Sequence, residues 1–170
     1  NMNLTGREDP AVCNGFELVE AGPVRVRFRA NLSFGRWEKK KDFMVPIMWN
    51  TPGVDYPTSF FVADFIVYAD LPWIECELRA NWWEDDTDLK VAADTCLKDT
   101  RAFYSIPFGC IERPTLRETS REKGMYEVPA LSWADLTDGS HGVAILNKGR
   151  HGHDALGGRL RLTLLTSPYG

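Results

Sequence analysis

The sequence predicts an all-β fold, a large antiparallel β-sandwich. Residues 24–32, 74–81 and 159–164 each alternate apolar with charged or polar side chains, which is typical of strands with one face in water. The chain is rich in aromatic residues, with six Trp, nine Phe and five Tyr, and such residues favour sheets. No segment carries a 3.6-residue apolar period over three turns. We therefore expect one β-sandwich domain over residues 1–170.

The other elements are predicted in chain order. Residues 60–68 are apolar on both faces apart from Asp64, which indicates a central strand covered on both sides. Residues 89–93, 101–106 and 142–147 are weaker strand candidates. Residues 114–124 are polar and charged, so we expect a long exposed loop there. Turn signals separate the strands at Thr51-Pro52-Gly53, Asp70-Leu71-Pro72, Pro107-Phe108-Gly109 and Asp138-Gly139.

Composition argues against several classes of protein. The formal net charge is −4 and the densest cationic run, residues 39–41, is short, so phosphate neutralisation on a nucleic acid is not expected. No stretch approaches the roughly 20 consecutive apolar residues of a membrane helix. Residues 1–10 lack the charged and apolar regions of a signal peptide. We expect a cytoplasmic protein with neither nucleic acid nor membrane as a partner.

The cysteines are widely spaced and never form a Cys-x-x-Cys pair, unlike disulfide scaffolds and zinc sites. We expect four ordinary thiols, at Cys13, Cys76, Cys96 and Cys110, with Cys76 on the apolar face of a strand. Glycosylation sequons at Asn3 and Asn31 would matter only in a secreted protein.

Several segments, in order, resemble the C-terminal β region of glycoside hydrolase family 38, the α-mannosidases, in its bacterial and cytosolic branch. The first is E-A-G-P-V at 20–24, and the second is W-I-E-C-E-L-R-A-N-W-W-E at 73–84, leading to L-K-V at 89–91. The third is the loop I-P-F-G-C-I-E-R-P-T at 106–115. Further matches are E-V-P-A at 127–130, W-A-D-L at 133–136, G-V-A-I-L-N at 142–147, G-H-D at 152–154 and the strand at 160–168. The resemblance covers residues 17–169 and is poor over residues 1–16 and 36–58.

The resemblance implies a galactose mutarotase-like supersandwich from a larger enzyme that hydrolyses terminal α-mannosides. The family's nucleophile, acid/base carboxylate and zinc lie mainly in an N-terminal domain, which a helical domain follows. None of those motifs can be placed here, so we expect no catalytic residue and no cofactor in this chain, and zinc in the parent's catalytic domain. The chain is expected to be truncated at both ends. Its expected partners are the parent's catalytic and helical domains, the α-mannoside substrate and other copies in a homo-oligomer.

His141, His151 and His153 are the nearest approach to a metal cluster, since two His on one strand face suit zinc and Asp154 could add a ligand. Their loose spacing and the lack of a fourth ligand favour ordinary turn and strand residues instead.

Acidic residues also invite a catalytic interpretation, because glycoside hydrolysis needs two carboxylates about 5 to 9 Å apart. Glu75 and Glu77 share a strand face, and Asp85, Asp86 and Asp88 follow soon after. No apolar pocket is evident around one of them to raise its pKa. We therefore interpret them as a solvated strand face and an acidic turn.

Four residues are candidates to lie near substrate: Trp82, Trp133, Glu112 and Arg113. Adjacent Trp82 and Trp83 must face opposite ways on a strand, so we expect at most one in the core. Domain interface and sugar contact stay equally open for the tryptophans. Glu112 and Arg113 either reach toward the parent's active site or lock a domain interface, and a local ion pair between them is the simpler interpretation.

Two other functions stay open. A freestanding carbohydrate-binding module would bind sugar through an exposed Trp. An aldose epimerase-like enzyme would need His141 or His153 on a concave sheet face.

Overall fold

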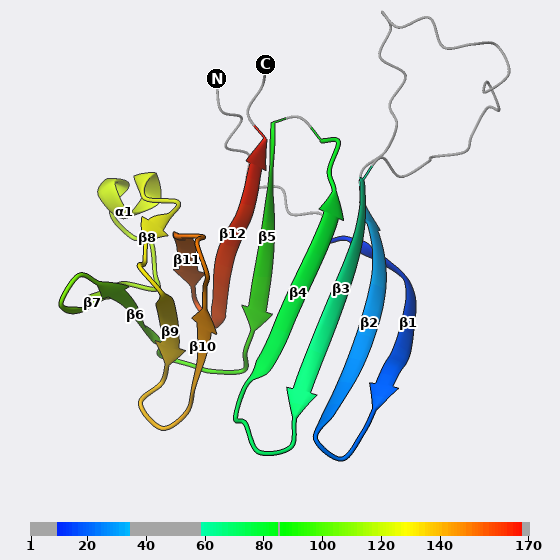
Figure 1. Ribbon diagram of the computed structural model, residues 1–170. Helices are drawn as coiled ribbons and strands as arrows, with labels where there is room; N and C mark the ends of the chain where they lie inside the picture. Colours follow the sequence, from blue (N-terminus) through cyan, green and yellow to red (C-terminus); the bar gives the residue numbers. More distant parts are fainter. Residues whose placement is uncertain (1–9, 35–58, 85, 168–170) are drawn as a thin grey trace, which may run out of the picture. The chain divides into compact units, whose positions relative to one another are not determined.

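The computed structural model describes residues 10–34, 59–84 and 86–167 (Figure 1). The chain divides into two compact units, residues 1–85 and 86–170, and we describe each separately. Both are built from antiparallel sheets, which confirms the predicted all-β class. The predicted turn at residues 51–53 and the sequon at Asn3 lie outside the described residues.

The first unit contains one four-stranded sheet in the order β1-β2-β3-β4. Its strands are β1 (Val12–Ala21), β2 (Arg25–Phe34), β3 (Ser59–Tyr68) and β4 (Ile74–Asn81). The predicted strands at 24–32, 60–68 and 74–81 are confirmed as β2, β3 and β4. The sequence did not indicate β1, because two register irregularities, between Cys13 and Gly15 and between Leu18 and Glu20, interrupt its alternation.

The pairing register gives this sheet one continuous apolar face. Phe16 pairs with Ala30, Ala30 with Ala63, and Ala63 with Leu78, so apolar residues face one another across all four strands. Cys76, opposite Phe65, lies on the same face, as predicted. The prediction that strand 60–68 is covered on both sides is wrong in part, because Phe60 and Val67 are exposed.

The opposite face of the sheet is organised around Asp64, whose side chain is 0% exposed. Arg29 on β2 binds it through two hydrogen bonds, Nε to Oδ1 at 2.7 Å and Nη2 to Oδ2 at 2.8 Å. Arg79 on β4 donates from Nη2 to Oδ2 at 2.9 Å, and Arg27 Nη1 lies 3.7 Å from Oδ2. These arginines cover a carboxylate that stands on an open sheet face, and they link three strands.

The second unit is a sandwich of two four-stranded sheets, β10-β9-β6-β7 and β5-β12-β11-β8. Ala102, Tyr104 and Leu136 from the first sheet and Ala155 and Leu160 from the second form one buried cluster. The strands are β5 (Thr87–Asp94), β6 (Arg101–Ile106), β7 (Gly109–Arg113), β8 (Val128–Pro129), β9 (Trp133–Thr137), β10 (Gly142–Leu146), β11 (Gly152–Leu156) and β12 (Arg159–Ser167).

All four strand predictions for this unit are confirmed, as β5, β6, β10 and β12. The turn at Asp138-Gly139 joins β9 to β10, and Gly139 has a φ of +94° that favours glycine. The expected long loop at 114–124 is wrong in part, because it contains the short helix α1 (Ser120–Gly124). Thr119 caps that helix and Glu122 completes a capping box. No helix in the described part of the chain is long and apolar enough to cross a membrane.

We expect Leu136→Ala to lower the free energy of unfolding of the second unit by about 2 to 5 kcal/mol, because Leu136 is 0% exposed in the buried cluster. Leu146→Ala is the matched control, since Leu146 on the neighbouring strand is 73% exposed. Its cost should stay within about 0.5 kcal/mol. Urea denaturation of both variants measures the difference, and equal costs would contradict the assigned core.

We expect the stability of the first unit to fall in acid, and Asp64→Asn to reduce that fall. The hydrogen bonds from Arg29, with the charges of Arg29, Arg79 and Arg27, lower the pKa of Asp64 below its ordinary 3.8. A lowered folded pKa means that the stabilisation is complete above pH 3.8 and is lost as the pH drops through the folded pKa. Asp64→Asn should therefore unfold at a lower temperature near neutral pH and lose less between about pH 6 and pH 3.

Thermal melts followed by circular dichroism measure this dependence. Asp70→Asn, in the exposed turn after β3, serves as the control and should behave like the native chain. An unchanged acid dependence in Asp64→Asn would show that Asp64 is not responsible.

Candidate functional site

A pocket of about 190 Å³ lies in the second unit. The strands β6, β7, β8 and β11 and the segment that carries α1 contribute to its lining. The lining combines apolar, cationic, acidic and aromatic side chains, and therefore offers both shape and hydrogen-bonding groups. Its polar and aromatic members are Tyr104, Glu112, Arg113, Arg117, Glu122, Tyr126, His153 and Asp154.

His153 is the buried polar group of the pocket. It lies on β11, is 0% exposed, and its ring stands edge-on to Tyr104 with centroids 6.5 Å apart. Its Nδ1 lies 3.2 Å from the carbonyl oxygen of His151, which can only accept, so Nδ1 carries the proton. Burial lowers the pKa of His153, so the ring is neutral at pH 7. Its Nε2 is then an acceptor, and it is buried with no protein partner.

Tyr104 and Arg113 lie next to this imidazole. Burial raises the pKa of the Tyr104 hydroxyl to about 12, so the phenol stays protonated. The guanidinium of Arg113 lies over the Tyr104 ring, 5.9 Å from its centroid. Arg113 thus packs on Tyr104 and not against Glu112, and its Nε is buried without a hydrogen-bond partner. Two residues of the lining therefore each carry a buried nitrogen without a protein hydrogen-bond partner, Nε2 of His153 and Nε of Arg113.

Asp154 follows His153 in sequence and is engaged by cations. Its Oδ1 lies 2.7 Å from Arg161 Nε and 3.8 Å from Arg117 Nη2, and its Oδ2 lies 3.4 Å from Lys90 Nζ. Arg117 also donates to the carbonyl of Tyr126 at 3.1 Å and stacks on the Tyr126 ring. Asp154 therefore anchors the segment that borders the pocket through Arg117.

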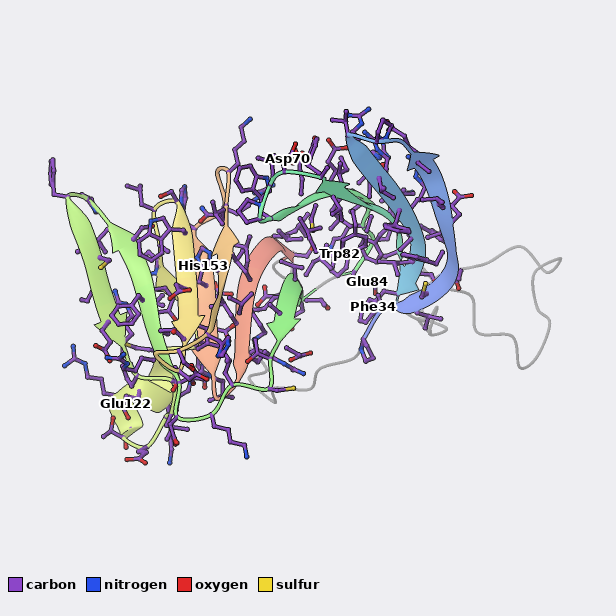
Figure 2. The ribbon with its side chains drawn as sticks, turned by 90° about the horizontal axis from the view of Figure 1, so that it is seen from below. Phe34, Asp70, Trp82, Glu84, Glu122 and His153 are labelled. Carbon is purple, nitrogen blue, oxygen red and sulfur yellow. The ribbon has the colours of Figure 1, made fainter. Side chains whose placement is uncertain are left out.

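The cap of helix α1 also stabilises this segment, which contains the helix. Glu122 accepts hydrogen bonds from the backbone of Thr119 at 2.9 Å and of Glu118 at 3.0 Å. These bonds lower the pKa of Glu122, so its carboxylate is ionised at neutral pH. Its place on α1, and that of His153 on β11, can be followed in Figure 2. The cap gives an otherwise polar segment a defined conformation beside the pocket.

The three histidines are not brought together. His141 lies in the β9–β10 turn, where its backbone N donates to Asp138 at 2.8 Å. The His151 ring lies against the carbonyls of Ala130 and Leu131, while His153 is in the pocket. Within the described residues, no group of three or more His, Cys, Asp or Glu could hold a metal ion.

The tryptophans do not line the pocket. Trp82 follows β4 and packs between Phe34 and Phe61, with ring centroids 6.1 and 5.8 Å away (Figure 2). Trp83 points outward and is exposed, which confirms that at most one of the pair is in the core. Trp133 begins β9, where its backbone is bonded to the hydroxyl of Ser105.

The acidic candidates stay on the surface. Glu75 accepts a hydrogen bond from the Tyr68 hydroxyl at 3.1 Å. Glu77 lies opposite Asp64 in the register of β3 and β4. Asp86 and Asp88 are exposed, and Asp85 lies outside the described residues. Glu112 lies on β7 and, with Arg113, lines the pocket.

Sequence reasoning did not identify Tyr104 and Arg117 as pocket residues. Tyr104 carries a usable signal, because alternation along the predicted strand 101–106 places it on the same face as Ala102. Arg117 carries none, since it lies in a polar stretch whose path only the tertiary structure determines.

Comparisons with known proteins identify the family. The model of the glycosyl hydrolases family 38 C-terminal domain matches residues 4–170. Alpha-mannosidase G of Dictyostelium discoideum is 35% identical over 152 residues, covering 89% of this chain and 12% of that protein. Alpha-mannosidase 2C1 of Mus musculus is 32% identical over 151 residues, covering 89% and 13%. The chain thus spans about an eighth of the length of these relatives.

A solved structure shows the same fold. The crystal structure of an alpha-mannosidase from Enterococcus faecalis V583 matches with a TM-score of 0.73 at 14% identity, over 93% of this chain and 19% of that one. Because the family model covers nearly the whole sequence and the curated relatives agree with it, this chain belongs to the glycosyl hydrolase family 38 C-terminal domain family.

Proposed function

We propose that the chain is an accessory β-sandwich domain of a larger α-mannosidase and that it supports the catalytic part of that enzyme without itself hydrolysing substrate. Its relatives are alpha-mannosidases about eight times longer than the matched region. The family model runs without interruption over both compact units, which supports their action as a single domain.

The observation that carries this proposal is the apolar face of the first unit. Its central residues are buried, for example Phe61 at 3% exposure, but its edge strands are open. Phe16 and Leu18 on β1 and Ile74 and Leu78 on β4 are all exposed. Large apolar side chains left exposed along both edges of a sheet face suit an interaction site. The partners that fit are the catalytic and helical domains of the parent chain.

The carboxylates of the described residues support a non-catalytic role. Asp64 and Asp154 form ion pairs with arginines, and the Glu122 carboxylate accepts hydrogen bonds in the capping box of α1. Burial raises the pKa of Asp135, but that residue lies on β9 without a second carboxylate beside it on that strand. We propose that the nucleophile, the acid/base carboxylate and a zinc ion belong to the parent's catalytic domain, which would act on terminal α-mannosides.

We further propose a cytoplasmic location, since Cys13, Cys76, Cys96 and Cys110 are exposed free thiols, as suits a reducing compartment. Glu112, Arg113, Trp82 and Trp133 remain our candidates for residues near the parent's substrate, with a domain interface the equal alternative for the two tryptophans.

The 170-residue chain should not hydrolyse an aryl α-mannoside, with or without added zinc, whereas the intact parent should. Release of the aryl group, followed by absorbance, measures turnover. Zinc-dependent turnover by the chain alone would overturn the accessory role.

A pair of substitutions tests the docking face. Ile74→Glu and Val24→Glu replace aliphatic residues of similar exposure, 60% and 69%, on the apolar face and in the β1–β2 turn. In the 170-residue chain both should be tolerated. In the parent, Ile74→Glu should cost on the order of 3 kcal/mol, because an unpaired charge would be buried at the interface, and Val24→Glu should cost far less. Thermal melts of all four proteins measure this, and equal costs in the parent would contradict docking through this face.

A further inference from the structure

We propose that Asn14 on β1 is a site of spontaneous deamidation, at which the backbone nitrogen of Gly15 displaces the side-chain amide group as ammonia. Such a modification converts a neutral residue into a carboxylate and needs no other protein. It goes beyond the proposed accessory role and is independent of it. Three features of the chain favour it: the glycine that follows Asn14, a bulge in β1, and exposure to solvent.

The reaction requires a backbone nitrogen that reaches the side-chain carbonyl of the preceding residue. The Gly15 nitrogen attacks Cγ of Asn14, the bond between Cγ and Nδ2 breaks, and the proton from the Gly15 nitrogen leaves with the amide as ammonia. The product is a five-membered cyclic imide. Water then opens either of the two C–N bonds that close this ring, which gives aspartate or isoaspartate. Apart from solvent water, every reacting group belongs to the chain itself.

Glycine leaves the path of attack open. Gly15 has no Cβ beside the attacking nitrogen, and glycine has the widest range of backbone conformations. Asn14 is exposed, and so are Asn31 and Asn81, but each of the latter two is followed by a bulky residue. A large side chain on the following residue hinders approach to the carbonyl. Exposure alone therefore does not select the site, and the glycine does.

The strand β1 is irregular at the place of reaction. In its pairing with β2, Cys13 lies opposite Leu32. The next pair is Gly15 with Asn31, so Asn14 is the extra residue of a bulge. Extended backbone keeps a side-chain carbonyl away from the following nitrogen, whereas the first residue of a bulge usually lies near the right-handed helical region. Because β1 is also the edge strand of its sheet, it can adjust around Asn14 without disturbing β3 and β4.

The local hydrogen bond accommodates the product. Nδ2 of Asn14 donates to Oγ of Ser33 at 2.8 Å, and Ser33 is 5% exposed. After ammonia leaves, the Ser33 hydroxyl can rotate and donate to the new carboxylate. Aspartate therefore fits the native strand. Isoaspartate lengthens the main chain by one carbon atom, at a place where the strand already contains an extra residue.

Asp138 supplies a contrast within the same chain. It also precedes a glycine, Gly139, and an aspartate can form the same imide by losing water. Its Oδ1 accepts hydrogen bonds from the backbone nitrogens of His141 and Ser140, both at 2.8 Å. These bonds lower the pKa of Asp138 to about 2, so the group is ionised at neutral pH. A carboxylate ion is a poor target for a nucleophile, and we expect no imide there.

Mass spectrometry of the folded 170-residue chain tests the site. Trypsin releases residues 8–25, in which Asn14 is the sole asparagine. After incubation at physiological temperature and mildly alkaline pH, this peptide should gain the mass difference between an amide and a carboxyl group. It should also separate into two isomers, of which one is methylated by an isoaspartyl methyltransferase. The rate in the folded chain should lie within about ten-fold of the rate in the urea-unfolded chain, because the bulge should add no more than ~1.4 kcal/mol to the barrier.

Gly15→Ala should slow the conversion about ten-fold or more, because its Cβ hinders the attacking nitrogen. The variant should fold, since the nearest described atom to that Cβ would be Nδ2 of Asn31 at 3.8 Å, an ordinary contact. Gly22→Ala is the matched control in the same peptide. Its Cβ would also find room, with the Arg25 carbonyl oxygen 3.5 Å away, and it should leave the rate unchanged.

Circular dichroism checks that each variant folds, and the native measurement stands without them. The proposal is overturned if the peptide of residues 8–25 keeps its mass in the folded chain while it gains mass in the unfolded chain. Conversion of Asn31 or Asn81 as fast as that of Asn14 would also overturn it, as would equal rates in the native and Gly15→Ala chains.

Discussion

The carboxylate of Asp64 is the constraint on which the first unit depends. A charged group in the middle of an otherwise apolar strand must be paired, and Arg29 and Arg79 on the two neighbouring strands supply the pairing. Side chains alternate along a strand, so a one-residue slip would move Asp64 to the opposite face and break every ion pair. The ionic cluster therefore fixes the register, and with it the continuous apolar face on the other side of the sheet.

That division of faces connects the fold to the proposed role. In the second unit, two sheets cover each other's apolar faces, and Leu136 and Leu160 are completely buried between them. In the first unit, the edges of the apolar face stay exposed at Phe16 and Ile74. A face of this kind is stable where a neighbouring domain covers it, and the relatives are long enough to supply one. The sheet thus suits the interface proposed for it as well as a core.

The same alternation produces the pocket. His153 and Asp154 are adjacent on β11, so one reaches Tyr104 while the other meets Arg161. Asp154 then holds Arg117, and the Glu122 cap holds α1, so these groups fix the border of the pocket. Nε2 of His153 and Nε of Arg113 are buried in this region without a protein partner.

The sequence by itself determined the all-β class, four strands with clear alternation or apolar character, three weaker ones, and the family, because these depend on local pattern and ordered motifs. It indicated His153, Glu112 and Arg113 but not the pocket they share. Strands β1, β7, β8, β9 and β11 lack a strong local signal, since bulges interrupt β1, β8 has only two residues, and β11 contains Gly, His and Asp. Only tertiary structure decided that the arginines gather on Asp64, that the histidines separate, and that Tyr104 meets both His153 and Arg113. The physical reason is that such contacts depend on pairing between strands distant in sequence, which no local pattern encodes.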